Sequence, residues 1–403
     1  MEENTIKVGN YVIIQRQNYT KLQKMKENCT VTLGKDVIDI DAVLGHRYDE
    51  TFRMVLKSGT KRTYMLEEVS QLTLTNNTQV EESGIDNRDI IDDGKSQTLS
   101  KSEIENLRDR ALSSGDIVQK LVENSRTFNS KTEYSQEKYL KKKEKKYFEY
   151  IQVRKPSIRL LAQMFYRQDP NKTLGIRLDD LSQLLTYANV HSDGHYLLYD
   201  SGTSGLVAAS ILNSIGHDTR GHLVHMHPGN ECQKSALQAM HFPDEQQRRC
   251  INVNLYSVLR CYHQNDIPEL TTETDTAKRK QTEEDTQQRK KPTWQYENER
   301  ACRILREQVD GLIIVAKEHP VNVTKELIAF LKGDRCVVVF SLVREPLQDL
   351  YFHLKERTDF VSINLSSNFM RSYQVLPERT HPEVSMNFGG YILTAYKLIK
   401  LTC

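Results

Sequence analysis

The segment LLYDSGTSGLVAASIL, which contains Asp200 to Gly205, has the residue types and spacing of a cofactor-binding turn. Such a turn follows a strand and usually reads acid-x-Gly-x-Gly-x-Gly, because glycines let the backbone approach the ligand and the next helix directs N–H groups at it. Asp200 and Gly202 fit this pattern. Ser204 and Leu206 replace the second and third glycines, and Gly205 is out of register. Two of the three steric requirements are therefore unmet.

The two positions that would complete such a site also lack the usual residues. The next expected strand, HLVHMHPG, ends in His227 and Pro228 and carries no acid to bind ribose hydroxyls. After the expected strand at 311–316, residues 317–319 read Lys-Glu-His, where amino-methylating enzymes often carry Asp/Asn-x-Pro-Pro. We therefore predict a degenerate site, with no catalytic and no cofactor-binding residues on this chain. Weak cofactor binding is the alternative.

Histidines and cysteines are the other residues that could carry chemistry. His225 and His227 would share one face of a strand, but the sequence offers no strong third ligand near them, so we predict no metal site. The seven cysteines are scattered and form no C-x-x-C pair, which is typical of a reduced, intracellular protein without structural zinc. The N-terminus lacks the pattern of a signal peptide, and no apolar stretch is long enough to span a bilayer.

The pattern of apolar residues divides the chain into four parts. Residues 1–74 contain short segments rich in Val, Ile, Tyr and Thr, which predict a small β-domain, an antiparallel barrel or sheet. Residues 75–99 are polar and acidic and are expected to form a flexible linker, and residues 100–190 a helical, Lys-rich connecting region. In residues 191–403 strands alternate with helices, which predicts a mostly parallel, doubly wound sheet with a polar insertion at 266–299.

Periodicity also predicts the individual elements. The expected strands are 11–16, 30–33, 51–57, 62–69, 196–199, 222–227, 251–255, 311–316, 336–341, 360–365 and 391–400. Helices are expected from near Ser135, and at 157–166, 178–187, 202–214, 324–331 and 347–354.

A dense basic cluster extends from Lys131 to Lys146. The net charge of +2 gives no global argument for nucleic acid, so the argument depends on such local clusters. Lysines attract phosphates, and interleaved tyrosines can stack on bases, so we predict RNA contact here. A solvated helix face is the alternative. The residues concerned are Lys138, Lys141, Lys142, Lys143, Lys145 and Lys146, the tyrosines Tyr134, Tyr139 and Tyr147, and the following Arg154 and Lys155.

A second cluster, from Met370 to Pro382, mixes Arg, Tyr, Thr and His between prolines, which indicates a fixed loop. Arg371 and Arg379 could bridge phosphates, and His381 could donate to a sugar or a base. We predict RNA contact here too, whereas a purely structural hairpin is the alternative.

Three blocks of the chain together resemble the non-catalytic subunit of the eukaryotic tRNA adenine-N1 methyltransferase. They are SKTEYSQEKYLKKKEKKY (130–147), the stretch from Arg154 through QDPNKTLGIRLDDLSQLLTYANV to Gly205, and YQVLPERTHPEVSM with the following GGY (373–391). The resemblance extends over most of the chain from residue 126 onward, and its first and third blocks are specific.

The resemblance implies both a fold and a function. The fold would be an N-terminal β-barrel-like domain followed by a Rossmann-like, methyltransferase-fold domain with a degenerate cofactor site. The chain would be the non-catalytic, tRNA-binding subunit of the complex that methylates adenosine 58 of the T-loop, and would not itself be an enzyme. A catalytic partner would bind S-adenosylmethionine. This chain and that partner would form a heterodimer, and two heterodimers would form a heterotetramer. The location would be nuclear, and the basic clusters at 278–280 and 289–291 fit either a bipartite nuclear signal or a solvated loop.

The resemblance also assigns the RNA-contacting positions. They are Thr127, Phe128, Lys131, Thr132, Glu133, Tyr134, Lys138, Lys141, Lys142, Lys143, Arg154, Lys155, Arg177, Arg371, Arg379, Thr380 and His381. Two other functions remain open at this point: a divergent but active S-adenosylmethionine-dependent RNA methyltransferase, and a general RNA-binding protein.

Overall fold

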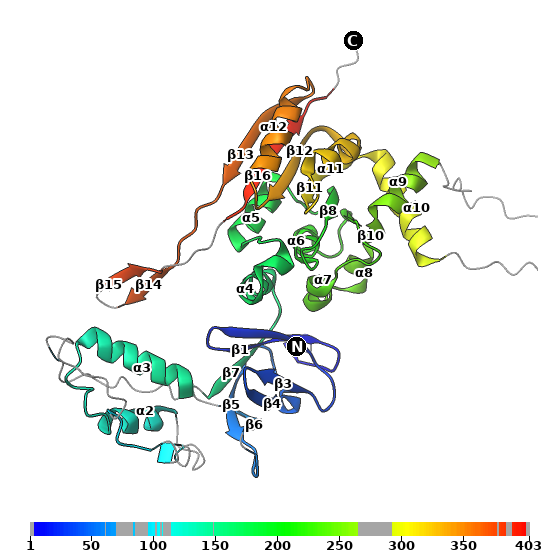
Figure 1. The fold of residues 1–403 in the computed structure, drawn as a ribbon. Coiled ribbons are helices and arrows are strands. Elements are labelled where there is room, and N and C mark those ends of the chain that lie inside the picture. The colour runs from blue at the N-terminus through cyan, green and yellow to red at the C-terminus, as the bar shows by residue number, and fades with distance from the viewer. Residues whose placement is uncertain are drawn as a thin grey trace, which may run out of the picture. The chain divides into compact units, whose positions relative to one another are not determined.

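The computed structural model describes residues 4–60, 62–69, 84, 96–100, 103–104, 107, 114–147, 149–264, 292–376, 379–383 and 389–399. The chain divides into two compact units, Met1–Pro156 and Ser157–Cys403 (Figure 1). Within the described ranges, no helix combines the length and the apolarity needed to cross a bilayer. Most of the predicted flexible linker at 75–99 and of the predicted insertion at 266–299 lies outside the described residues.

A seven-stranded sheet forms the body of the first unit (Figure 1). Its strands lie in the order β2-β1-β7-β5-β6-β4-β3, and every neighbouring pair is antiparallel except β4 and β6. The strands are β1 (Tyr11–Arg16), β2 (Tyr19–Lys24), β3 (Thr30–Leu33), β4 (Asp36–Asp39), β5 (Thr51–Leu56), β6 (Thr63–Glu68) and β7 (Tyr150–Arg154).

The two edges of this sheet approach each other, so that the sheet is barrel-like and nearly closed. Lys21 Nζ on the edge strand β2 donates to the carbonyl of Thr32 on the other edge strand, β3, at 2.9 Å. Arg16 at the end of β1 pairs with Asp36 at the start of β4, also at 2.9 Å. Alternate side chains of the strands point inward and form the core. The buried residues of this core include Ile6, Val12, Ile14, Met25, Val31, Ile38, Phe52, Ile151 and Val153.

Strand β7 corrects the predicted domain boundaries. Residues 100–190 were expected to form one connecting region, but β7 lies between β1 and β5 inside the first sheet. The helices that follow residue 156 belong to the second unit. Periodicity did not reveal β7 because the strand has only five residues, follows a lysine-rich helix, and pairs with strands that are distant in sequence.

Two helices, α2 (Ser114–Glu123) and α3 (Glu133–Tyr147), also belong to the first unit and contact each other. The ring of Phe128, in the turn between them, lies edge to face on Tyr139 of α3, with 5.5 Å between ring centroids. Gln136 Nε2 of α3 donates to the carbonyl of Phe128 at 2.9 Å. The turn that leads into the lysine-rich helix is therefore held by packing and by a buried hydrogen bond.

The second unit is built on another seven-stranded sheet, in the order β10-β9-β8-β11-β12-β16-β13. The first five strands are parallel, and β16 runs antiparallel to both of its neighbours, β12 and β13. This arrangement confirms the predicted strand–helix alternation and the mostly parallel sheet. The strands are β8 (His195–Asp200), β9 (His222–His227), β10 (Cys250–Asn254), β11 (Val309–Val315), β12 (Leu331–Ser341), β13 (Phe360–Ser367) and β16 (Tyr391–Lys397), and a separate hairpin consists of β14 (Tyr373–Leu376) and β15 (Arg379–Pro382).

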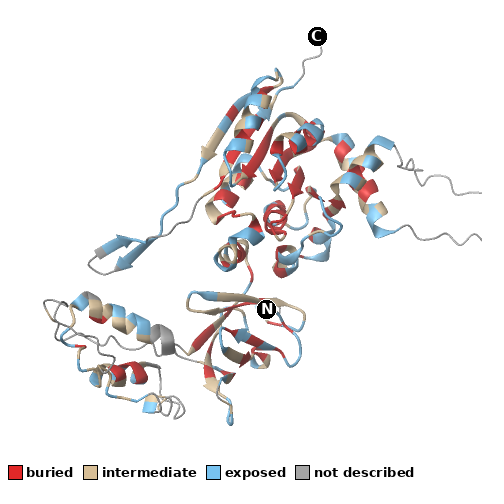
Figure 2. Ribbon diagram, in the orientation of Figure 1, coloured by how far each residue is buried: buried red, intermediate tan, exposed pale blue. Residues whose placement is uncertain are grey.

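Helices cover both faces of this sheet (Figure 1). One face of the sheet packs against α9 to α12, and α6 packs on the other face. Figure 2 shows that buried residues are concentrated in the strands and in α6. The helices are α4 (Ile158–Gln168), α5 (Leu178–Tyr187), α6 (Leu206–Ile215), α7 (Ser235–Met240), α8 (Asp244–Arg248), α9 (Leu255–Gln264), α10 (Thr293–Glu307), α11 (Pro320–Leu327) and α12 (Glu345–Lys355).

The place of β7 in the first sheet gives a testable prediction. Ile151, the second residue of β7, is fully buried, and its side chain packs in the core of the barrel-like sheet. We expect Ile151→Ala to lower the free energy of unfolding by about 2–5 kcal/mol, because a buried branched side chain is replaced by a cavity. Denaturant unfolding of the full chain measures this.

The matched control is Val8→Ala, which truncates an apolar side chain that is 55% exposed. This control is expected to change the free energy of unfolding by less than about 0.5 kcal/mol. Equal effects of the two substitutions would show that residues 150–154 do not lie inside the sheet.

Candidate functional site

The glycine turn lies between β8 and α6. Its first N–H groups donate hydrogen bonds to the side chain of Asp200. The carboxylate of Asp200 accepts hydrogen bonds from the backbone N–H of Gly202 at 2.9 Å and from that of Thr203 at 2.8 Å. It also accepts from the hydroxyl of Thr203. The helix predicted at 202–214 begins only at Leu206, because the residues before it form this turn. Asp200 therefore caps its own turn with three hydrogen bonds.

The loop after β9 covers the rest of the turn. The N–H of Ser204 donates to Oε1 of Gln233 at 2.8 Å, and the hydroxyl of Ser204 donates to the carbonyl of Lys172 at 2.8 Å. Gly205 has a φ of +74°, and a Cβ at this position would lie 2.6 Å from the carbonyl oxygen of Gln233. Glycine is therefore needed at 205, where two backbone segments pack closely. The N–H of Ser204 is already hydrogen-bonded to Gln233.

A buried ion pair lies beneath the turn. His225 on β9 points Nε2 at Oδ2 of Asp200, at 3.7 Å, and its Nδ1 lies 3.0 Å from Oδ1 of Asn252 on β10. Burial favours the neutral ring, but the Asp200 carboxylate and the neighbouring Cys232 and Cys250 raise the pKa of His225 well above its usual value. Burial also opposes ionisation of Asp200, but the contact with His225 and the hydrogen bonds of the turn lower the pKa of this carboxyl. The two residues therefore form a charged pair in the core.

The segment after β11, where a catalytic loop was sought, also bonds within the chain. The backbone N–H of Lys317 donates to the hydroxyl of Ser201 at 2.7 Å. A Cβ on Gly202 would lie 3.6 Å from Nζ of Lys317, so this side chain lies against the turn. His319 Nε2 pairs with Asp349 at 3.3 Å. The hydrogen bond between Lys317 and Ser201 connects the segments that follow β11 and β8, and the side chain of Lys317 lies against the glycine turn.

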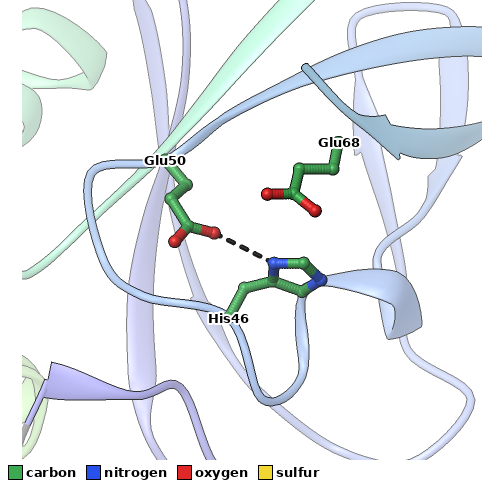
Figure 3. A group of neighbouring side chains, drawn as sticks. All are labelled: His46, Glu50 and Glu68. Carbon is green, nitrogen blue, oxygen red and sulfur yellow. Dashed lines mark hydrogen bonds and ion pairs between the residues drawn. The ribbon is translucent and has the colours of Figure 1, made fainter. Parts of the chain in front are cut away.

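Among the described residues, one group has the geometry to hold a metal ion, and it lies in the first unit (Figure 3). The possible ligand atoms of His46, Glu50 and Glu68 lie within 4.8 Å of one another. His46 Nδ1 is already hydrogen-bonded to Glu50 at 3.0 Å, and both side chains are 32% exposed. Because this pair is satisfied and solvated, the group supports no metal proposal, and the expectation of no metal at His225 and His227 stays a prediction.

The lysine-rich helix α3 presents part of its charge to solvent. Lys138, Lys141 and Lys142 are exposed, and Lys141 pairs with Glu137 at 2.9 Å one turn earlier. Two other lysines, Lys131 and Lys143, lie over the ring of Tyr139, at 5.0 and 5.1 Å from its centroid. Of the remaining predicted contacts here, Thr127 and Thr132 are half-buried and Glu133 is exposed, whereas the side chain of Tyr134 lies outside the described residues.

Two residues predicted to contact RNA, Phe128 and Arg177, are buried in the structure. Phe128 is 5% exposed and packs on Tyr139, so it supports the turn before α3. Arg177 is 2% exposed and pairs with Asp179 at 2.5 Å. Arg177 Nη2 also donates to the carbonyl of Asn368, and Asn368 Nδ2 donates to Asp180 at 2.8 Å. Sequence similarity alone could not show whether Arg177 forms internal contacts or faces solvent, because this depends on its burial in the folded chain.

The contacts of Arg177 hold the base of the β14–β15 hairpin. Asn368 precedes the hairpin, and Gly389 follows it, and a Cβ on Gly389 would lie 2.6 Å from Arg177 Nη2. The hairpin and the residues that lead into it carry exposed Arg371, Thr380 and His381, with Arg371 lying 5.5 Å from the ring centroid of Phe369. Residues 373–376 and 379–382 form a two-stranded hairpin, and the side chain of Arg379 lies outside the described residues.

Arg154 and Lys155 lie at the end of β7. Arg154 contacts Asp49 at 3.4 Å and Gln15 at 3.3 Å, and Nζ of Lys155 lies 6.0 Å from the ring centroid of Tyr48. Arg154 is half-buried and Lys155 is exposed. Both are cations at the surface of the first sheet, and Arg154 already has a carboxylate neighbour.

Comparison with known proteins relates this chain to one family. A family model described as the Gcd10p family matches residues 5–294. A protein of Mus musculus named tRNA (adenine(58)-N(1))-methyltransferase non-catalytic subunit TRM6 is 29% identical, and the match covers 98% of this chain and 89% of that protein. A protein of the same name from Dictyostelium discoideum is 28% identical, with 98% and 80% covered.

One solved structure shows the same fold. An S-adenosylmethionine-dependent O-methyltransferase from Thermotoga maritima matches with a TM-score of 0.52 and 11% identity, covering 98% of this chain and 96% of that chain. This similarity confirms the predicted Rossmann-like methyltransferase fold and carries no statement about activity.

The buried pair of Asp200 and His225 predicts a pH dependence. The pKa of His225 is raised in the folded state, so the pair stabilises the fold fully below the unfolded-state pKa of 6.5 and progressively less as the pH rises through the folded-state pKa. We expect the difference in free energy of unfolding between the wild type and His225→Gln to shrink as the pH is raised from about 6 to about 9. Denaturant unfolding at several pH values measures this difference.

The control is His217→Gln, which removes a histidine whose side chain is 72% exposed and which pairs with Asp218, itself 84% exposed. It should leave stability and its pH dependence unchanged. A difference for His225→Gln that stays constant over the same pH range would contradict a charged pair in the core.

Proposed function

Because the chain belongs to the Gcd10p family, we propose that it binds tRNA and holds it for methylation by a separate catalytic subunit. It is a non-catalytic subunit of the tRNA (adenine(58)-N(1))-methyltransferase, the name that its relatives in Mus musculus, Dictyostelium discoideum and Debaryomyces hansenii carry. The chemistry of methyl transfer belongs to the partner.

The closed glycine turn is the observation that carries this proposal. A methyl donor would need free N–H groups at the turn and an acid after the second strand. Here Asp200 and Gln233 take the N–H groups of the turn, and β9 ends in His227. The residues present therefore do not fit S-adenosylmethionine, and we expect this cofactor on the catalytic partner only.

The exposed face of α3 is the proposed main contact with tRNA. Lys138, Lys141 and Lys142 project into solvent from one helix. Cations so close to one another repel, and binding of phosphates relieves this repulsion while it releases counterions from the RNA. Lys131 and Lys143 lie over Tyr139, so this ring supports the cations rather than offering a free stacking surface.

The hairpin β14–β15 is the proposed second contact. Exposed Arg371 and His381 can donate to phosphate or sugar oxygens, and Thr380 can add a hydroxyl. Arg177 and Asp180 hold Asn368, in the segment that leads from β13 to the hairpin. The arrangement favours contact with the RNA backbone over readout of sequence.

We further propose a heterodimer with the catalytic subunit that pairs into a heterotetramer, located in the nucleus. Exposed apolar side chains on the edge strand β13 and on the two elements that contact it support a subunit interface there: Val361 on β13, Tyr396 on β16 and Phe352 on α12. An obligate interface of this kind buries more than a transient contact. The basic clusters at 278–280 and 289–291 support a nuclear signal in the sequence.

Two other functions predict different outcomes. A divergent, active methyltransferase would bind S-adenosylmethionine without a partner. A general RNA-binding protein would leave N1-methyladenosine in the T-loop unchanged when it is depleted. The family membership and the relatives' names favour the subunit of the methyltransferase complex over both.

Removal of three lysines from α3 tests the tRNA contact. We expect Lys141→Ala, Lys142→Ala and Lys143→Ala together to weaken tRNA binding by the complex with its partner. The slope of log affinity against log salt concentration should fall by up to about 0.9 for each phosphate that no longer has a lysine partner. Binding of unmodified tRNA at several salt concentrations measures this, and methyl transfer should fall at limiting tRNA.

A control triple removes the same charge elsewhere. Lys26, Lys35 and Lys325 are exposed and lie outside α3 and the hairpin. Their replacement by Ala should lower affinity much less. Equal decreases in the two triples would mean that only net charge matters, and an unchanged salt slope in the α3 triple would remove that helix from the RNA interface.

A further inference from the structure

Cys232, in the loop after β9, carries a thiol that has no role in the function proposed above. Its Sγ lies 3.3 Å from Nδ1 of His225, and the thiol donates to Oδ1 of Asn252, also at 3.3 Å. The residue is half-buried and forms no disulfide. A nucleophilic side chain therefore lies within hydrogen-bonding distance of an imidazole.

The imidazole beside this thiol is held by Asp200. Nε2 of His225 lies 3.7 Å from Oδ2 of Asp200, and the two side chains are 2% and 3% exposed. Burial opposes a charge on the ring, but the contacts with Asp200 and Cys232 raise the pKa of His225 well above its usual value. A charged imidazole carries a proton on both nitrogens, so Nδ1–H is directed at Asn252 and at the sulfur of Cys232.

This arrangement has the parts of an activated nucleophile. Such a nucleophile contacts a histidine, and a third group orients that histidine. Here Cys232, His225 and Asp200 take the three positions. A cation beside a thiol favours the thiolate, which is the form that attacks electrophiles. Burial without a cation has the opposite effect, as at Cys336, where it raises the pKa to about 12.

Small molecules can reach the sulfur, because Cys232 lines a cavity of about 880 Å³ at the carboxyl ends of β9 and β10. His227, in the same lining, is 8% exposed, and its Nδ1 has no hydrogen-bond partner among the described residues. Buried nitrogens are normally paired with protein, water or ligand. Lys234 and Glu231 add charges of both signs to the lining. These groups suit a small zwitterionic molecule attached to Cys232.

We propose that Cys232 is a site of thiol–disulfide exchange with a small, zwitterionic peptide disulfide such as oxidised glutathione. The thiol gives its proton to solvent, and the resulting thiolate attacks one sulfur of the disulfide. The bond between the two sulfurs of the reagent breaks, and the other half leaves as a thiolate that takes a proton from solvent. Cys232 is thereby oxidised and one free thiol is released, and an excess of free thiol reverses the reaction.

Alkylation of the full chain by iodoacetamide at neutral pH, followed by peptide mass mapping, measures the reactivity of each cysteine. We expect Cys232 to react about tenfold or more faster than Cys261. Cys261 is the internal control because it is also half-buried and lines a cavity, of about 290 Å³. Burial, followed by the contact with Cys261, raises the pKa of Cys302 to about 12, so this neighbouring thiol offers Cys261 no charge.

Two variants separate the charged pair from the burial of the thiol. His225→Gln removes the cation and should slow the alkylation of Cys232 about tenfold. Asp200→Asn removes the carboxylate that keeps the ring charged and should change the rate in the same direction. His217→Gln removes an exposed histidine and should leave the rate unchanged. An unaltered circular dichroism spectrum and an unaltered rate at Cys261 show that a variant is folded.

Incubation with oxidised glutathione tests the exchange itself. We expect one glutathionyl group on the peptide that contains Cys232, which dithiothreitol removes and which Cys232→Ser lacks. A disulfide between Cys232 and Cys250 would also support the proposal. Cys250 is 6% exposed and lies on the other side of Asn252, so it can react only after Cys232 has done so.

Equal alkylation rates of Cys232 and Cys261 would overturn the proposal. So would an unchanged rate of Cys232 in a folded His225→Gln chain, or the absence of any disulfide at Cys232 after incubation with oxidised glutathione. None of these measurements involves tRNA. The proposed contact of α3 with tRNA is tested by its own lysine variants, so either idea can fail without the other.

Discussion

The carboxylate of Asp200 is the group on which the chemistry of the second unit depends. In a working nucleotide site, N–H groups of the glycine turn bind the ligand. Here Asp200 accepts hydrogen bonds from those of Gly202 and Thr203 and pairs with His225 below. Gln233 then takes the N–H of Ser204. A ligand at this turn would have to break hydrogen bonds that the fold itself makes.

The residues proposed to contact RNA lie on other elements than the glycine turn. The cations of α3 belong to the first unit, and the hairpin β14–β15 leaves the second sheet between β13 and β16. Arg177 anchors that hairpin from inside, so it contributes to a proposed RNA surface without touching it. The glycine turn and the proposed RNA-contacting residues therefore belong to different elements of the chain.

Periodicity predicted the doubly wound sheet because its central strands contain apolar runs, as in β11 with its five consecutive buried residues. It missed β7, whose partners are distant in sequence. The missing glycines were visible in the sequence, but the side chains that fill the turn were not, since Gln233 and Lys317 come from separate loops. Burial likewise separates Arg177 and Phe128 from the exposed lysines.

The central claim is that this chain has given up the methyl donor while its partner keeps it. Isothermal titration of S-adenosylmethionine into the full chain, without the catalytic subunit, tests this most directly. The account predicts no heat of binding for the chain alone and binding when the partner is added. Binding to the isolated chain with a micromolar dissociation constant would contradict it, because a turn closed by Asp200 and Gln233 could not then be the state of the protein in solution.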